Sequence, residues 1–388
     1  MITTRCVRGR AALMAGHCAG MVDLVALPVW VGTLISAYRF DPQQAGLLAT
    51  LFLAGAVLAS VVLAPRLNRL NGRLTATLGY GAAAVGFGLA STTAEFGTLA
   101  LLHALSGVAA GAALSVTHGT IARSANPHRL FAIVGMALGV FAVVFLGSMP
   151  PIVAAFGGPA LFRMLAAVMA VGAIFAALAF PVPDAPAASA DAARGTGAQP
   201  LPRAVWFGIL GVACMGLVQS MTFSFLERVG SDRGFGLQAV TGVLIALGLV
   251  NLFPPVLAAL LEKRWPARRV LLVGPALQAL LVVVIMNSPA FAPYAAAASV
   301  FAAVMIFTHT FGFGLLARLD PSGRALAATP AMLMFGAAIG PILGGTLVKA
   351  FGYGSIAIAA VLIDALAVWA FTRIPRPAGA AMAVGAAA

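Results

Sequence analysis

The sequence predicts an all-α membrane protein with twelve transmembrane helices arranged as two six-helix pseudo-repeats. Of its 388 residues, 62% are hydrophobic and only 9% are charged, whereas roughly 25% are charged in an ordinary soluble domain. A membrane-spanning helix needs about 20 mostly apolar residues, so the apolar content is sufficient for about twelve of them. A soluble globular domain and a disordered chain are both excluded by this composition.

Twelve apolar runs of spanning length divide into two sets of six. They are continuous rather than alternating at every second residue, which favours helices over the strands of an outer-membrane barrel. The first set comprises residues 11–35, 43–63, 74–91, 96–121, 130–155 and 160–180. The second set comprises residues 204–226, 237–261, 270–286, 291–316, 325–348 and 354–371. A segment rich in Pro, Ala and Asp separates the sets, so we expect an N-terminal bundle at 1–180, a cytoplasmic linker at 181–203 and a C-terminal bundle at 204–388.

The basic residues predict the orientation of the chain. With the N-terminus in the cytoplasm, 18 of the 23 Lys and Arg residues fall on the cytoplasmic side and 5 on the outside. This bias follows the positive-inside rule, and it explains the net charge of +13 without a nucleic-acid partner. Because the chain is also short and rich in Ala, Arg and Gly, we expect a multi-pass protein of the bacterial inner (plasma) membrane with both termini cytoplasmic.

The two halves show a weak internal similarity at an offset of about 195 residues. The aligned pairs are Gly16 with Gly211, Gly79 with Gly274, Arg69 with Arg264 and Arg73 with Arg268. Several secondary transporters are built from two parallel repeats of six helices, with the solute site between the halves. The similarity therefore favours a duplicated six-helix unit.

One glycine-rich motif resembles a known family. The run Gly336-Ala-Ala-Ile-Gly340-Pro341-Ile-Leu-Gly344-Gly345 is similar to the GxxxGPxxGG pattern of the major facilitator superfamily. In the exporter branch of that family the pattern lies in helix 5, whereas here it lies in helix 11, the counterpart of helix 5 in the second half. Helix 5 of this chain has only separate glycines and prolines, which is a departure from the exporter pattern.

Two weaker motifs resemble the same family. Arg69, Gly72 and Arg73 follow the second helix and are similar to part of a GxxxDRxGRR pattern, and His103 and Gly107 occupy the Arg and Gly positions of an RxxxG pattern in helix 4. The resemblance implies a twelve-helix fold, alternating access between the two halves, and a cavity lined by helices 1, 4, 7 and 10.

Two acidic residues lie in the middle of apolar runs, where an ionisable group is costly and is a functional candidate. Asp23 is about twelve residues into the first run, or roughly 18 Å, which is near the midplane where transporter sites lie. Trp30 is seven residues further on and lies on nearly the same helix face. We expect Asp23 to bind a proton or a solute amine, the alternative being a structural hydrogen bond. For Asp364 in the last helix we expect a pairing with a neighbouring helix.

Four histidines lie within the predicted spans. His103 and His118 share one face of helix 4, while His17 and His309 lie in helices 1 and 10. We expect His103 to take part in proton coupling with Asp23, and His17, His103 and His309 to contact the solute. The alternative for each is a satisfied structural histidine, and the spacings match no metal motif.

Polar and aromatic residues in helix 7 complete the expected solute site. Gln219 and Phe223 could line the cavity together with Asp23 and Trp30, which would suit an amphipathic or aromatic solute. The alternative for these side chains is ordinary packing between helices.

These patterns predict a secondary active transporter. The leading interpretation is an antiporter that exports a small amphipathic or cationic organic compound in exchange for protons. The alternative is uptake of a small organic metabolite by proton symport or facilitated diffusion, and a transporter-like sensor is a third possibility. Phosphate-binding, hydrolase, metalloprotease and dinucleotide motifs are absent from the sequence, so we expect no enzyme activity, cofactor or metal. The expected partners are a small-molecule solute, protons and the lipid bilayer, with the chain as a monomer.

Overall fold

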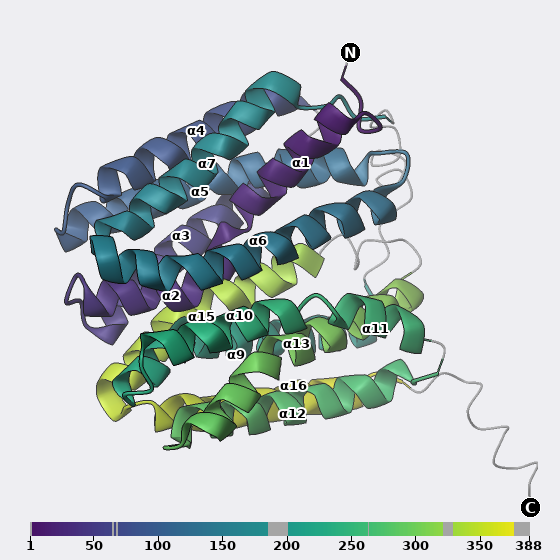
Figure 1. Cartoon of the computed structure of the whole chain (residues 1–388). Coiled ribbons are helices and arrows are strands. Elements are labelled where there is room, and N and C mark those ends of the chain that lie inside the picture. The colour runs from purple at the N-terminus through teal and green to yellow at the C-terminus, as the bar shows by residue number, and fades with distance from the viewer. Residues whose placement is uncertain are drawn as a thin grey trace, which may run out of the picture.

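A computed structural model describes residues 2–63, 66, 69–184, 201–262, 264–320 and 329–375. Within these residues every regular element is an α-helix (Figure 1). One isolated bridge joins Thr3 to Val182. The predicted all-α fold class is therefore confirmed. Most of the expected linker, residues 185–200, lies outside the described residues.

The helices follow the predicted runs in order. The first seven are α1 (Val7–Gly20), α2 (Val22–Ser36), α3 (Pro42–Leu63), α4 (Gly72–Ala90), α5 (Phe96–Ala122), α6 (Pro127–Phe156) and α7 (Pro159–Ala179). The others are α9 (Arg203–Asp232), α10 (Leu237–Val250), α11 (Pro254–Leu261), α12 (Ala267–Asn287), α13 (Phe291–Leu319), α15 (Thr329–Phe351) and α16 (Gly354–Thr372). Eleven stretches in the described part of the chain are long and apolar enough to cross a membrane. Of the twelve expected spans, only α4 is not among them, because five of its nineteen residues are glycine and Arg73 lies in its first turn.

Two of the predicted spans are broken helices. The first consists of α1 and α2, which are separated at Met21, where the backbone leaves the helical region. The eighth consists of α10 and α11, separated at residues 251–253. Pro254 and Pro255 explain the second break, because proline has no N–H to continue the hydrogen bonds of α10.

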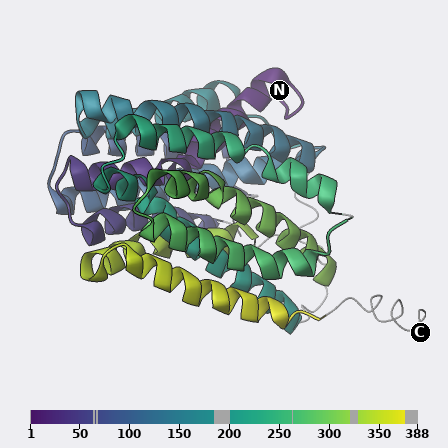
Figure 2. The ribbon, with the colours of Figure 1, turned by 60° about the horizontal axis from the view of Figure 1, so that its bottom comes forward.

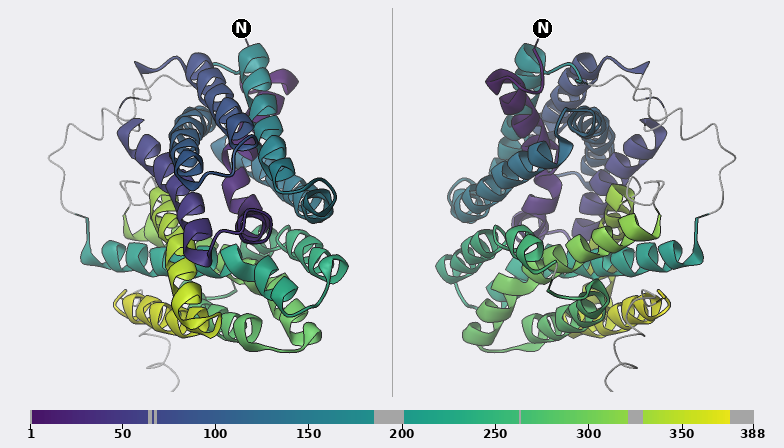
Figure 3. Two further views of the ribbon diagram at one scale, coloured as in Figure 1. Left: turned by 90° about the vertical axis from the view of Figure 1, so that its left-hand side faces the viewer. Right: turned by 90° about the vertical axis from the view of Figure 1, so that its right-hand side faces the viewer.

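Helices α1–α7 pack together as one bundle and α9–α16 as a second (Figures 1 and 3). All the long helices run roughly along one direction (Figure 2). Small residues bring them close, as membrane helices require. A Cβ atom on Gly107 of α5 would lie 2.7 Å from the carbonyl carbon of Phe52 in α3, and one on Gly111 would lie 2.8 Å from that of Ala56. The glycine stripe of the fourth span therefore serves helix packing.

The two halves repeat one structural detail that the sequence offset predicts. Arg73, at the start of α4, donates a hydrogen bond to the carbonyl oxygen of Ala177 near the end of α7. Arg268, at the start of α12, donates to the carbonyl oxygens of Ile374 and Thr372 at the end of α16. In each bundle, an arginine thus neutralises the negative end of the last helix dipole.

The two ends of the molecule differ in charge. We call the end with residues 123–126, 262 and 264–266 the basic end, which lies on the right of Figure 1. The opposite end holds the turns at residues 37–41, 157–158 and 288–290. The positive-inside rule predicts that the basic end faces the cytoplasm.

Candidate functional site

Asp23 lies at the break between α1 and α2 and is only 1% exposed. Its Oδ1 atom accepts a hydrogen bond of 2.8 Å from the backbone amide of Leu24. Its Oδ2 atom is buried and has no hydrogen-bond partner among the described residues. An isolated carboxylate in such a place is costly, whereas a protonated, neutral carboxyl group is tolerated.

The register of the first span against α5 shows which residues of α5 lie near Asp23. This span runs antiparallel to α5. Three contacts define which residues of the two helices lie opposite each other: Gly16 contacts Thr117, Gly20 contacts Leu114, and Trp30 contacts His103. Interpolation between them places Asp23 level with Ala110 and Gly111, which have no side-chain hydrogen-bond donors. On the side of α5, therefore, no side-chain hydrogen-bond donor lies at the level of Asp23.

His103 has both ring nitrogens bonded in this conformation. Its Nδ1 atom lies 2.6 Å from the carbonyl oxygen of Leu99, and Nε2 accepts a hydrogen bond of 3.2 Å from Nε1 of Trp30. A neutral ring with its proton on Nδ1 satisfies both bonds. The ring is 0% exposed, and its edge packs near Phe87 and Phe162. The contact joins α2 to α5, and the expected role of His103 in proton coupling stays a prediction.

His17 and His118 form a second pair, nearer the basic end. His17 Nδ1 lies 2.9 Å from His118 Nε2, so one ring donates and the other accepts. The ring of His118 also packs edge-on against Phe131. The sequence places both histidines in spans but gives no signal that they meet, because their pairing depends on how α1 packs against α5.

The candidates in the C-terminal bundle are more accessible than those around Asp23. Gln219 is half-buried, and its Oε1 atom lies 3.4 Å from Nε2 of Gln278. His309 is half-buried as well, with Nδ1 bonded to the backbone carbonyl four residues earlier, and Phe223 is 8% exposed. No hydrogen bond joins these side chains to Asp23 in the part of the chain that the structure describes. The expected contact of all of them with one solute stays a prediction.

Asp364 differs from its sequence-based interpretation. The residue is 1% exposed in α16, and neither carboxyl oxygen has a hydrogen-bond partner among the described residues. The expected pairing with a neighbouring helix is therefore wrong in this conformation. Among the residues that the structure covers, no group of three or more His, Cys, Asp or Glu side chains could hold a metal ion.

The two bundles meet along α3 and α15, toward the opposite end. A Cβ on Gly46 would lie 2.7 Å from the carbonyl carbon of Pro341, and one on Gly345 would lie 2.8 Å from that of Pro42. The hydroxyl of Thr50 also accepts a hydrogen bond of 3.1 Å from the backbone of α15. Thus Gly345 and Pro341 of the motif in helix 11 face the other bundle.

The remaining glycines of this motif have a different partner. Gly336, Gly340 and Gly344 recur at every fourth residue and pack against α9 of the same bundle. One motif therefore holds α15 to its own bundle on one face and allows close contact with α3 on the other.

A polar latch closes the outer edge of this interface. Lys349 donates a hydrogen bond of 2.9 Å to Oδ2 of Asp41 and one of 3.3 Å to the side chain of Gln43, whose amide also bonds Thr346. Partial burial raises the pKa of the Asp41 carboxyl, but the bonds from Lys349 and from the amide of Gln44 outweigh this effect and lower the pKa below its ordinary value. Sequence reasoning missed this latch because its partners are about 300 residues apart.

Glu227 is a second residue that sequence reasoning missed. The predicted span ends at Leu226, whereas α9 continues to Asp232. Glu227 is therefore a helical residue, and its carboxyl group packs against α2. A Cβ on Gly32 would be 3.0 Å from the carboxyl carbon of Glu227. Ser231 donates a hydrogen bond of 2.7 Å to the same group. α2 and α9 thus add to the contact between the bundles.

The sequence of residues 12–322 matches the model of the Major Facilitator Superfamily. The chain belongs to this superfamily. Its fold of two packed helical bundles agrees with that membership, and the chain is accordingly a multi-pass membrane transporter of small-molecule solutes. No subfamily is identified, and no curated protein matches the sequence significantly.

Solved structures share the fold over almost the whole chain. The nucleoside transporter NupG has a TM-score of 0.73 at 15% identity, covering 95% of this chain and 98% of its own. A D-xylose–proton symporter has a TM-score of 0.73 at 14% identity, covering 94% and 96%. A bacterial homologue of the lysosomal transporter Spinster, in an inward-facing and occupied conformation, has a TM-score of 0.71 at 15% identity, covering 94% of each chain. At such identities the likeness concerns the fold.

Proposed function

We propose that the protein is a secondary active transporter that exports a small amphipathic or cationic organic compound in exchange for protons, with Asp23 as the coupling residue. The observation that carries this proposal is the buried Asp23 carboxyl group, whose Oδ2 atom has no partner in the described part of the chain. It lies at a helix break, and broken helices form the midplane sites of many transporters.

The contacts between the bundles favour an inward-facing conformation. The close contacts of α3 with α15 and of α2 with α9 lie toward the opposite end. If the basic end faces the cytoplasm, as the positive-inside rule predicts, these contacts close the outside. In this conformation Asp23 is excluded from water and carries its proton. Separation of the bundles on the outer side would change the packing around α2 and α9.

Proton exchange requires that a solute compete with the proton on Asp23. Binding a cationic group near the carboxyl would favour its ionised form and release the proton. Exchange of one proton for one monovalent cation moves no net charge, so the pH gradient drives it and the membrane potential does not. Each pH unit supplies about 1.4 kcal/mol, enough for about a tenfold concentration ratio of the solute.

The other candidate residues divide into two roles in this proposal. Trp30 and His103 position α2 against α5, because coupling by His103 would require its two hydrogen bonds to break. Gln219, Phe223 and His309 contact the solute from the C-terminal bundle. His17 contacts the solute only in a conformation in which its hydrogen bond to His118 is broken.

Uptake of a small metabolite by proton symport is the second candidate function. The observation in its favour is that the glycine-rich motif lies in α15 and packs on α9 and α3, whereas exporters carry it in helix 5. Two fold neighbours are named as a nucleoside transporter and as a xylose–proton symporter.

Flux through the purified protein in liposomes tests the proposal. Ethidium serves as an amphipathic cation, uridine and xylose as neutral solutes, and the lumen is made acidic. The expected result is accumulation of ethidium in the acidic lumen, which protein-free liposomes and a collapsed pH gradient do not show. Transport of uridine or xylose with protons, without any ethidium exchange, would contradict export and favour symport.

The orientation has its own test. Single cysteines at Ala125 and Ala290, in exposed turns at the two ends, are labelled in intact cells with a membrane-impermeant reagent. We expect labelling at position 290 and protection at position 125. The reverse pattern would place the basic end outside.

A further inference from the structure

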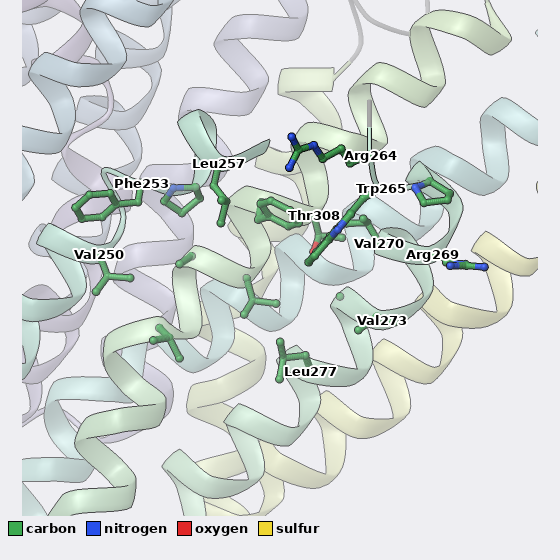
Figure 4. A pocket seen from close by; sticks show the side chains of 17 residues that line it. Val250, Phe253, Leu257, Arg264, Trp265, Arg269, Val270, Val273, Leu277 and Thr308 are labelled. Atoms are coloured by element: carbon green, nitrogen blue, oxygen red, sulfur yellow. The ribbon is translucent and has the colours of Figure 1, made fainter. Parts of the chain in front are cut away.

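A groove lies in the C-terminal bundle, apart from the candidate coupling site. Its volume is about 830 Å³, within the range of roughly 300–1,000 Å³ typical of small-ligand sites. Helices α10 and α11 line one side of it, α12 lines another, and residues 300–308 of α13 lie between them (Figure 4).

The break in the eighth span creates this groove. Because Pro254 and Pro255 cannot continue α10, α11 begins as a separate helix. On the other side, α12 is drawn close to α13, since a Cβ on Gly274 would lie 2.9 Å from the Cβ of Thr308. α13 therefore contacts both neighbours, and the space between α11 and α12 stays open. Phe253 at the break is 68% exposed.

The lining is a continuous apolar strip. Val273 and Leu277 of α12 are 61% and 40% exposed, and they face Leu257 of α11 across the groove. From Arg269 to Leu277 the strip extends eight residues, or about 12 Å at 1.5 Å per residue. Such a strip on a membrane helix fits a hydrocarbon chain rather than a polar solute.

Two arginines lie where the groove reaches the basic end. Arg264 extends over the groove toward Leu257, and Arg269 lies on the other side of Trp265 (Figure 4). Both are exposed, and neither guanidinium group has a hydrogen bond or ion pair within the described ranges. The nearby acid Glu262 is held at 3.5 Å by Arg318 instead.

Trp265 lies between the apolar strip and the turn that carries Arg264. It is 51% exposed and packs edge-on against Phe307, with ring centroids 5.9 Å apart. Tryptophan is enriched at the boundary between hydrocarbon and headgroups. The groove therefore places an apolar strip on the hydrocarbon side of this residue and two free cations on the headgroup side.

We propose that this groove binds one anionic phospholipid from the leaflet at the basic end, with its headgroup between Arg264 and Arg269 and an acyl chain along α12 and α13. Guanidinium groups match phosphate geometry, and basic pockets between membrane helices bind anionic headgroups. A cationic amphiphile would be repelled by the arginines. Free phosphate would leave the apolar strip uncovered.

Native mass spectrometry of the detergent-purified protein tests this site without any transport assay. The protein is mixed with equal amounts of phosphatidylglycerol and phosphatidylethanolamine that carry the same acyl chains. We expect one phosphatidylglycerol to be retained in preference. Each basic side chain near the headgroup contributes about fivefold, so the double variant Arg264→Gln/Arg269→Gln should bind about 25-fold more weakly. The matched control is Arg203→Gln, an exposed arginine at the same end, which should change nothing.

A second variant tests the apolar part of the site. Ala303→Trp fills the groove but leaves both arginines in place, and it should also abolish preferential retention. Three results would each overturn the proposal: equal retention by the parent and the double arginine variant, equal retention of the two lipids by the parent, or displacement of phosphatidylglycerol by millimolar inorganic phosphate.

Discussion

Substitution of Gly345 by alanine tests whether the contact between α3 and α15 is a closure that must open. The Cβ of an alanine at this position would lie 2.8 Å from the carbonyl carbon of Pro42, and nearer still to its oxygen. Ordinary contacts begin at 3.4 Å, so the two helices would have to separate by at least the difference of 0.6 Å. Both clashing atoms belong to the backbone, so no rotamer change relieves the clash.

Such overpacking costs typically about 1–3 kcal/mol. Because the clash exists only while the bundles touch on this side, Gly345→Ala should shift the population away from this conformation by about 5- to 150-fold. The measure is the reactivity of a cysteine placed at Thr50, in a background without the three native cysteines. An impermeant thiol reagent should modify it faster in Gly345→Ala.

The matched control is Gly242→Ala in α10, where a Cβ would meet nothing within 4 Å. This variant should leave the reactivity at position 50 unchanged. Equal protection of that cysteine in Gly345→Ala and Gly242→Ala would refute the inference that α3 and α15 form a closure that must open.

Two further predictions concern the latch and the tryptophan. Lys349→Met should shift the same equilibrium by less than about fivefold, because exposed ion pairs contribute about 0–1 kcal/mol, and high salt should have a similar effect on the parent. Since the pKa of Asp41 is lowered, the contribution of the latch is present above the ordinary value near 3.9 and is lost as the pH falls through the lowered value. The thiol itself titrates near 8.5, so the test compares Lys349→Met with the parent at the same pH, and the ratio of their thiol reactivities should be constant from about pH 5 to 8. A change of this ratio within that range would exclude Asp41 as the titrating group. Trp30→Phe leaves the buried Nε2 of His103 without a donor, at a cost of about 1–3 kcal/mol, so the Tm of the detergent-purified protein should fall clearly. The control Trp206→Phe, at an exposed position, should have little effect on the Tm. Equal Tm values for the two variants would contradict the structural role of this bond.

Much of the fold follows from local properties of the sequence. Continuous apolar runs identify the helices, and the arginine pair Arg73 and Arg268 marks the duplicated unit, since both bond the last helix of their bundle. The break at 251–253 was foreseeable from Pro254 and Pro255, although the apolar run across them predicts one helix. The break at Met21 has no such local signal.

The arrangement of the site was less predictable, because it depends on contacts between distant segments. Asp23 is evident from its charge within an apolar run. That His17 bonds His118, and that Trp30 bonds His103, depends on the register between the first span and α5, which a single sequence does not encode locally. The polar end of α9 was missed for another reason. An apolar run is counted only as far as its first charged residue, here Glu227, whereas the helix continues to Asp232.

Uphill transport by an Asp23→Asn variant tests the central claim most directly. Asparagine keeps the size of the side chain but cannot exchange a proton. The control is Asp364→Asn, since Asp364 is equally buried and, like Oδ2 of Asp23, its carboxyl oxygens have no hydrogen-bond partner among the described residues. In liposomes with an acidic lumen, the parent and Asp364→Asn should accumulate ethidium, while Asp23→Asn should only exchange it without net accumulation. Accumulation by Asp23→Asn equal to that of the parent would contradict the account and leave Asp23 with a structural role.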